Sequence, residues 1–326
     1  MISYKELIDI EKKILSGQQM SKETFIKLLS IPVESEEVDM LGNVARDMAT
    51  IVAKNKGYIW AAVGVDYMPC PENCEFCSFG EKWNIIKKPY VWQDEEIINM
   101  ARYFATKGAK WITLRTTEYY PLEKIMNLAK KIRFNIDSNF EIVINTGEIT
   151  NEMANKLKNS GIEVVYHSLR LREGIQTGIP KESRKKTLLA IKNSVLDLAF
   201  LVEPIGIEHT NEEIADIFFT AMEYNAILTG AMARVPVVGT PLGKYSALEE
   251  RRLAQIIAVI RLASGRRAPN ICVHPPVKLA MNWGANVCVV ESGAIPRDRK
   301  NYKEPWNIFT IEKGRKLLGE AGYDLD

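Results

Sequence analysis

The chain has 326 residues, of which 46% are hydrophobic and 26% charged, and its formal net charge at pH 7 is +2. This length can bury a large core, either as two ordinary domains or as one α/β barrel. A charge so near zero excludes a general attraction to nucleic acid or to an anionic membrane, and no apolar run approaches a membrane span. The N-terminal stretch MISYKELIDIEKKILSGQQM has no signal-peptide core. We therefore expect a cytoplasmic protein whose thiols stay reduced.

Residues 1–56 have apolar residues at helical spacing. Three segments carry the pattern, and the first of them ends at a glycine. They read SYKELIDIEKKILSG, SKETFIKLLS and EEVDMLGNVARDMATIVAKNKG. We expect this part to form an N-terminal helical extension of a second unit, residues 57–326.

From residue 57 onward, short apolar runs rich in β-branched residues alternate with charged helical stretches. Alternation at about 25–35 residues per unit is typical of parallel strands joined by helical crossovers. Eight such units predict an α/β fold of the (β/α)8 TIM-barrel type, whose active site lies at the carboxyl ends of the strands. A doubly wound sheet is the main alternative. The predicted strands are 58–65, 110–116, 140–146, 162–169, 197–205, 226–235, 269–274 and 286–291.

Three of the five cysteines, Cys70, Cys74 and Cys77, lie in CPENCEFC, in the loop after the first predicted strand. A structural zinc site normally has four nitrogen or sulfur ligands, and neither His167 nor His274 is near in sequence. The polar residues between the cysteines argue against a chance buried cluster. Three thiolates at this C-x3-C-x2-C spacing suit a [4Fe–4S] cluster that leaves one iron without a protein ligand.

This loop resembles that of the radical S-adenosylmethionine superfamily, which reads C-x3-C-x-aromatic-C. Phe76 is the aromatic residue here, and the resemblance implies that it packs against the adenine. In that superfamily the open iron binds S-adenosylmethionine (SAM), and an electron from the cluster cleaves SAM to a radical that abstracts hydrogen. The resemblance thus implies a [4Fe–4S] cluster, SAM and a reducing partner such as ferredoxin or flavodoxin.

Further motifs resemble those of biotin synthase and its relatives, which include the hydrogenase-maturation radical enzyme and methylornithine synthase. RVPVVGTPLG (234–243) resembles that family's V-x-G-T-P-L segment, and IIAVIRLA (256–263) resembles the helix after it. GAN (284–286) resembles the start of the last strand in the same family. The resemblance covers residues 57–292, which is most of the predicted barrel.

The same resemblance implies which residues contact SAM. Thr117 and Glu118 stand where the superfamily binds the amino group, and Arg184 matches an arginine that pairs with the carboxylate. Taken alone, Glu118 could equally be a surface carboxylate and Arg184 a solvated helix charge. The other implied contacts are Ser168 and Arg170 in YHSLRLRE and Gly206 in EPIGIE. Four further residues are candidates for a polar substrate pocket or for ordinary strand-end charges: Arg115, Tyr119, Arg172 and Arg234.

Biotin synthase also holds a second, sacrificial iron–sulfur cluster, whose middle-strand cysteines this chain lacks. Cys272 stands about where that family has an arginine, and Cys288 follows in the last predicted strand. His274 is two residues from Cys272, so both are expected on one strand face. These three residues are either inert and buried or ligands of a second iron–sulfur cluster.

A second cluster would suit sulfur insertion. The leading hypothesis is therefore a sulfurtransferase similar to lipoyl synthase or biotin synthase, with an octanoyl-type aliphatic substrate, either a small molecule or a group on an acyl carrier. A second radical SAM subunit would be its partner, as in archaeal two-component lipoyl synthases. The alternative is a radical rearrangement or fragmentation without a sacrificial cluster. An iron–sulfur scaffold or electron-transfer protein is the alternative from another class.

Overall fold

The strands of the computed structural model, which describes residues 2–297 and 309–325, close into a parallel barrel. Strand β10 pairs with both β9 and β11, and β11 pairs with β1, so the sheet returns on itself. The predicted (β/α)8 barrel is confirmed, and the doubly wound alternative is wrong. In barrel order the strands are β1 (Tyr58–Gly64), β4 (Ala109–Arg115), β5 (Glu141–Asn145), β6 (Ile162–Tyr166), β7 (Asp197–Ala199) with β8 (Val202–Ile205), β9 (Leu228–Ala233), β10 (Asn270–His274) and β11 (Val287–Gly293).

The fifth predicted strand is interrupted between β7 and β8. At the break, the backbone N–H of Leu201 donates to Ser168 Oγ over 3.1 Å. A side chain thus takes the place of a backbone acceptor, which satisfies a buried donor where regular pairing stops.

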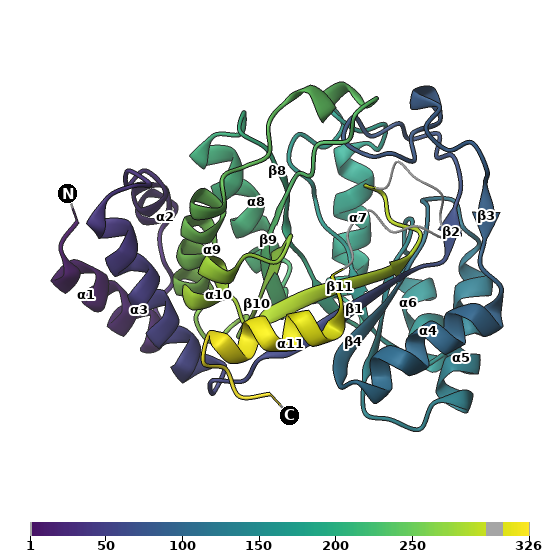
Figure 1. Cartoon of the computed structure of the whole chain (residues 1–326), viewed down its shortest axis with the longest axis horizontal. Helices are drawn as coiled ribbons and strands as arrows, with labels where there is room; N and C mark the ends of the chain where they lie inside the picture. Colours follow the sequence, from purple (N-terminus) through teal and green to yellow (C-terminus); the bar gives the residue numbers. More distant parts are fainter. Residues whose placement is uncertain (1, 298–308, 326) are drawn as a thin grey trace.

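Helices follow the strands and cover the outside of the barrel (Figure 1). The N-caps Thr150, Thr210 and Thr310 each accept a hydrogen bond from the third residue of their helix, as threonine does at helix starts. Neither α10, α11 nor the short β2–β3 ribbon was expected from the sequence. The helices are α4 (Asp94–Thr106), α5 (Leu122–Asn135), α6 (Asn151–Asn159), α7 (Lys181–Lys192), α8 (Asn211–Glu223), α9 (Glu250–Ser264), α10 (Lys278–Asn282) and α11 (Ile311–Glu320), and the ribbon is β2 (Asp66–Tyr67) with β3 (Tyr90–Val91).

Three N-terminal helices, α1 (Tyr4–Leu15), α2 (Lys22–Leu29) and α3 (Glu36–Val52), lie together beside α8 and α9 (Figure 1). Phe25 stacks on Phe218 of α8, with 4.7 Å between the ring centroids. The buried side chain of Gln255 in α9 donates to the carbonyls of Leu28 and Ile31 over 3.1 and 2.9 Å. The extension therefore shares one continuous hydrophobic core with the barrel.

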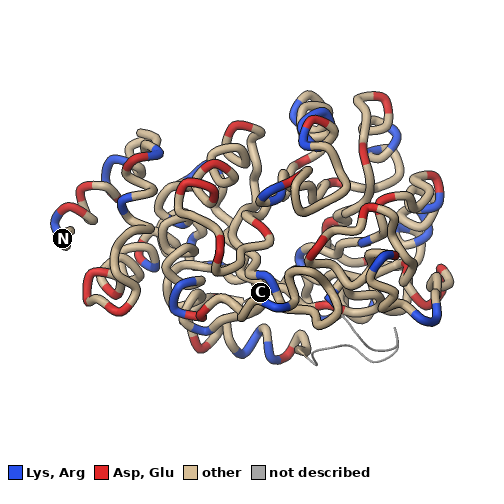
Figure 2. Tube along the Cα trace, turned by 90° about the horizontal axis from the view of Figure 1, so that it is seen from above, with Lys and Arg blue, Asp and Glu red and all other residues tan. Residues whose placement is uncertain are grey.

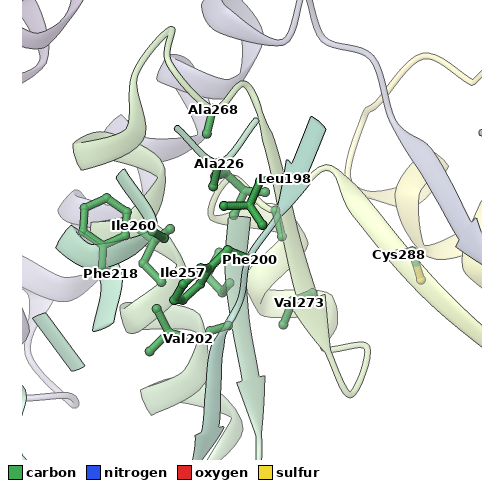
Figure 3. Packing of buried hydrophobic residues seen from close by; sticks show 14 of the residues in the cluster. Leu198, Phe200, Val202, Phe218, Ala226, Ile257, Ile260, Ala268, Val273 and Cys288 are labelled. Atoms are coloured by element: carbon green, nitrogen blue, oxygen red, sulfur yellow. The ribbon is translucent and has the colours of Figure 1, made fainter. Parts of the chain in front are cut away.

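The barrel interior is filled by an aromatic layer. Trp60 and Tyr166 meet edge to face at 5.3 Å, and the indole N–H of Trp60 donates to Thr113 Oγ1 over 2.6 Å. On the other side of the strands, residues such as Phe200, Ile257 and Ile260 pack between sheet and helices (Figure 3). Large side chains thus fill the inside of the barrel below the carboxyl ends of the strands.

The GAN stretch has a structural role at the amino ends of the strands. Fully buried Arg261 donates to the carbonyls of Gly284 and Pro269, each over 2.7 Å, and to Asn286 Oδ1 over 2.6 Å. Asn286 Oδ1 also accepts the backbone N–H of Ile271 over 2.8 Å. Burial lowers the pKa of Arg261 to about 10, so it stays charged at neutral pH. This network ties α9 to β10 and β11.

Acidic and basic residues are interspersed along the chain, as Figure 2 shows. Of the helices within residues 2–297 and 309–325, none is both long enough and apolar enough to cross a bilayer.

Candidate active site

A cavity opens at the carboxyl ends of the strands, where the barrel prediction expected it. The cysteine loop forms one side of it. Residues of β8 and residues at or after the carboxyl ends of β4, β5, β6, β9 and β11 form the others. Cys70, Cys74 and Cys77 all line this cavity, and so does Phe76.

Backbone hydrogen bonds hold the cysteine loop in shape. The N–H of Cys70 donates to the carbonyl of Phe79 over 2.7 Å. Across the cavity, the N–H of Gly178, in the loop after β6, donates to the carbonyl of Glu72 over 2.8 Å. Asn73 has φ of 47°, in the left-handed region that asparagine tolerates better than most residues. The loop is therefore anchored at its base and at its tip.

The three thiols fit an iron–sulfur cluster better than a single metal ion. Among the described residues, no three His, Cys, Asp or Glu side chains converge on a point that could hold one ion. In a [4Fe–4S] cluster each cysteine binds a different iron, so the three sulfurs need not converge on one point. Burial raises the pKa of Cys77 to about 12, so its thiolate needs a positive partner such as iron.

Four charged residues, two of them buried and two half-buried, form a chain along the cavity wall beside the cysteines. Arg184 Nη2 donates to Glu118 Oε2 over 3.1 Å, and Arg184 Nε lies 3.7 Å from Glu173 Oε2. The guanidinium of Arg170 donates two hydrogen bonds, of 2.8 and 2.9 Å, to the carboxylate of Glu173. Arg184 is only 5% exposed, so its interpretation as a solvated helix charge is wrong. Burial raises the pKa of Glu118 although Arg184 opposes this, and Glu118 is therefore not an ordinary surface carboxylate either.

Sequence reasoning missed Glu173, whose side chain is 1% exposed. Burial alone would raise the pKa of Glu173, but the charge and hydrogen bonds of Arg170 keep it below the usual range. Thr177 Oγ1 donates to its other oxygen, Oε1, over 2.6 Å. Its position three residues after Arg170, in RLRE, was the available signal, because an acid at that spacing can reach back to the arginine.

The remaining predicted SAM contacts divide into two groups. Thr117 and Ser168 line the cavity, and Asp66 accepts the backbone N–H of Thr117 over 2.8 Å. Gly206 does not line it. A Cβ on Gly206 would overlap the guanidinium of Arg234, which does line the cavity, so the arginine separates Gly206 from the site.

At the β11 side of the cavity lies a second charged group. Arg115 Nη1 donates to Glu291 Oε1 over 2.8 Å, and Arg297 also binds Glu291. Nearby, the phenol of Tyr166 donates to Glu203. Burial raises the pKa of Glu203, which keeps this carboxyl closer to its neutral form. Four of these residues line the cavity, namely Arg115, Tyr166, Glu203 and Arg297.

Of the other pocket candidates, only Arg234 lines the cavity. Arg172 is bound to Glu213 over 2.7 Å, and Tyr119 is 66% exposed. These two are strand-end side chains outside the cavity.

The predicted second ligand set is not brought together. Cys272 packs among the buried hydrophobic side chains inside the barrel. Cys288 instead lies in the hydrophobic core between β11 and the helices (Figure 3). A Cβ on Gly314 of α11 would lie 3.2 Å from Cys288 Sγ. Register explains the separation: Cys272 pairs with Val287, and the next residue, Cys288, points to the opposite face. His274 lies 3.5 Å from Glu291, and burial lowers the pKa of His274 to about 3.

Comparison with known proteins agrees with this geometry. Residues 69–221 match the model of the Radical SAM superfamily. Biotin synthases of Persephonella marina and Clostridioides difficile are both 24% identical to the chain, over 97% and 98% of it and 96% and 99% of their own lengths. Among solved structures, methylornithine synthase (PylB) has a TM-score of 0.81 at 17% identity and covers 97% of both chains. HydG, a maturase of the FeFe-hydrogenase, has a TM-score of 0.80 at 17% identity, covering 100% of this chain and 77% of HydG.

The barrel with its cysteine loop at the carboxyl ends of the strands is the fold of a radical enzyme that uses SAM. Over residues 69–221, slightly less than half of its length, the chain matches the radical SAM superfamily. It is similar to biotin synthases over nearly its full length, and it has the same fold as PylB and HydG. The superfamily match and the similarity to biotin synthases imply a [4Fe–4S] cluster and SAM as cofactors.

Proposed function

We propose that the chain is a radical SAM enzyme whose cluster is bound by Cys70, Cys74 and Cys77 and whose small substrate lies inside the barrel mouth. The observation that carries the proposal is that these thiols and the charge chain from Glu118 to Arg170 line one cavity. When bound, the cluster and SAM supply an electron and a hydrogen-abstracting radical. An external one-electron reductant, of the ferredoxin or flavodoxin class, would reduce the cluster.

The charge chain has the chemistry to orient SAM. Glu118 would accept hydrogen bonds from the ammonium of the methionine part, and Arg184 would donate to its carboxylate. Glu173 keeps the two arginines in place, since it contacts both of them. Phe76, with Arg170 at 5.8 Å from its ring centroid, offers an aromatic face for the adenine.

The opposite side of the cavity would hold the substrate. Arg115 and Arg297 would place positive charge beside the substrate. The hydrogen-bonded pair Tyr166 and Glu203 would line the bottom of the cavity with polar groups. The aromatic layer beneath keeps this end of the cavity from opening into the lower barrel. A small polar substrate, anchored by the arginines, fits these surroundings.

For the reaction itself, we favour a rearrangement or fragmentation without a sacrificial cluster. The supporting observation is that Cys272 and Cys288 face opposite sides of the barrel wall, so they do not form a common ligand set. Sulfur insertion into an octanoyl-type or similar substrate is the second candidate, and the full-length likeness to biotin synthases favours it.

Anaerobic reconstitution followed by iron analysis tests this choice. We expect about four irons per chain, the content of one [4Fe–4S] cluster. Reduced protein should convert SAM to 5′-deoxyadenosine. About six or eight irons per chain would instead support sulfur insertion, because they require a second cluster of the [2Fe–2S] or [4Fe–4S] type. Four irons without any SAM cleavage would favour an iron–sulfur scaffold or electron-transfer protein.

A further inference from the structure

A second cleft lies outside the catalytic cavity, between the N-terminal extension and the barrel. Gly206 lies in its wall, and Arg234, packed against Gly206 and paired with Glu208, belongs to the catalytic cavity on the other side. The cleft has both apolar and polar lining residues. The apolar lining is Val33, Ile205, Ile207, Ile214, Ala247, Leu248 and Ile256, and the polar lining is His209, Ser246, Glu249 and Arg252.

Arg252 is a half-buried cation whose partners are all neutral. Its guanidinium donates to the carbonyl of Leu29 over 2.7 Å, to Gln255 Oε1 over 2.6 Å and to Asn211 Oδ1. Within residues 2–297 and 309–325, no carboxylate forms an ion pair with it. A partly desolvated charge without a counter-ion is unfavourable, so an anion in the cleft would stabilise it.

A buried histidine adds a donor without an acceptor. The side chain of His209 is 0% exposed, and its Nδ1 accepts the backbone N–H of Gly206 over 2.9 Å. The proton of the neutral ring must therefore be on Nε2, which has no hydrogen-bond partner and lies 3.9 Å from the nearest oxygen of Glu208. Burial lowers the pKa of His209, which keeps the ring in this neutral form.

The start of α9 faces the same cleft. This helix has 15 residues, and no side chain caps its N-terminus, where Glu249 is the N-cap. Free N–H groups and the helix dipole favour negative charge at such a position. Two carboxylates already stand at this helix start, the N-cap Glu249 and the first-turn residue Glu250, and both are exposed, so solvent screens their charge.

We propose that this cleft binds a small organic anion, with a carboxylate or phosphate head at Arg252 and the start of α9 and an apolar body against the isoleucine side chains. The site is independent of the SAM chemistry. The arginine without a carboxylate partner and the uncapped helix start select against cations, and the isoleucine side chains of the lining favour an anion that has an apolar body.

Calorimetric titration of the cluster-loaded protein tests the site. The probes are hexanoate, hexyl phosphate, hexylamine and inorganic phosphate. We expect one molecule of hexanoate or hexyl phosphate to bind at least tenfold more tightly than hexylamine and than inorganic phosphate. The stronger of the two anions identifies the head group. Equal binding of hexanoate and hexylamine would overturn the proposal.

Two variants locate the binding. Ile207 is 52% exposed, so Ile207→Glu should fold normally and weaken hexanoate binding at least tenfold by placing a negative charge in the cleft. Val238→Glu is the matched control, since Val238 is 60% exposed and does not line the cleft; its affinity should be unchanged. Arg252→Gln should also lose binding, while Arg251→Gln should not, because Arg251 pairs with Asp39 instead. Unchanged affinity in Ile207→Glu would show that the probe binds elsewhere and the cleft assignment is wrong.

Discussion

Arg170 directs its Nη1 at the sulfur of Cys74, 3.6 Å away. This contact joins the loop after β6 to the cysteine loop after β1, and it places a permanent positive charge beside a proposed cluster ligand. A guanidinium at that position stabilises a thiolate over a thiol. The charge chain that we assign to SAM therefore begins at the cluster ligands themselves.

The cysteine loop is the first test of the assignment. Replacing Cys70, Cys74 or Cys77 by Ala removes one of three iron ligands, so each variant should lose cluster absorbance and 5′-deoxyadenosine formation. Chromatography of the anaerobic reaction measures the product. Cys288→Ala is the matched control, because its sulfur lies in the helix-facing core, and it should keep both signals. Product formed by Cys74→Ala would refute the radical assignment.

Glu118 and Arg184 should determine the affinity for SAM. Each would make a charge-assisted hydrogen bond worth about 1.5–3 kcal/mol, so Ala at either position should weaken SAM binding by about tenfold or more. Equilibrium dialysis measures the affinity, and the cluster absorbance should be unchanged. Arg172→Ala is the control, since Arg172 pairs with Glu213 outside the cavity. If both site variants bind SAM like the wild type, their polar contacts serve the fold alone.

Glu173 should matter for stability as well as for binding. Glu173→Gln leaves two buried arginines without their shared carboxylate, and breaking such a buried pair costs about 3–5 kcal/mol. Urea unfolding of the cluster-free protein gives the free energy. Glu182→Gln, an exposed partner of Lys185, should change it by less than about 1 kcal/mol. Equal effects of the two substitutions would mean that Glu173 does not hold the arginines.

Glu208 should make stability depend on acid pH. Burial by itself would raise the pKa of Glu208. The hydrogen bond from Arg234 outweighs this effect and lowers the pKa to about 2. The stabilisation is present above the unfolded pKa of about 4.3 and is lost as pH falls toward 2. Glu208→Gln should thus be less stable than wild type by at most about 3 kcal/mol at pH 7, with a difference that shrinks below pH 4. A pH-independent difference would argue against this ion pair.

The network around Asn286 should stabilise the fold without affecting chemistry. Asn286→Ala leaves Arg261 and the N–H of Ile271 without their common acceptor, a loss of about 1–3 kcal/mol for each unsatisfied donor. Asn135→Ala, at an exposed helix end, should cost less than about 0.5 kcal/mol. Urea unfolding measures both. A stable Asn286→Ala protein would leave the GAN stretch without a structural explanation.

Local patterns were enough to predict the barrel and the cysteine loop. All eight predicted strands are present in the structure. They could be predicted because buried parallel strands are apolar runs rich in β-branched residues, and charged amphipathic helices separate them. The spacing of Cys70, Cys74 and Cys77 is also local, since one short loop holds all three. The helix α10, with 5 residues, and the 2-residue strand β2 were missed because such short elements carry too little periodicity.

Relations between distant segments depended on closure of the barrel. Cys272 and Cys288 look alike in sequence, yet the register of β10 against β11 turns one inward and the other outward. Glu173 meets Arg184 only because the loop after β6 folds back over the start of α7. Hydrophobic periodicity is a property of each segment by itself. Strand register and the contacts between side chains from distant segments depend instead on how all eight strands pair in one closed barrel.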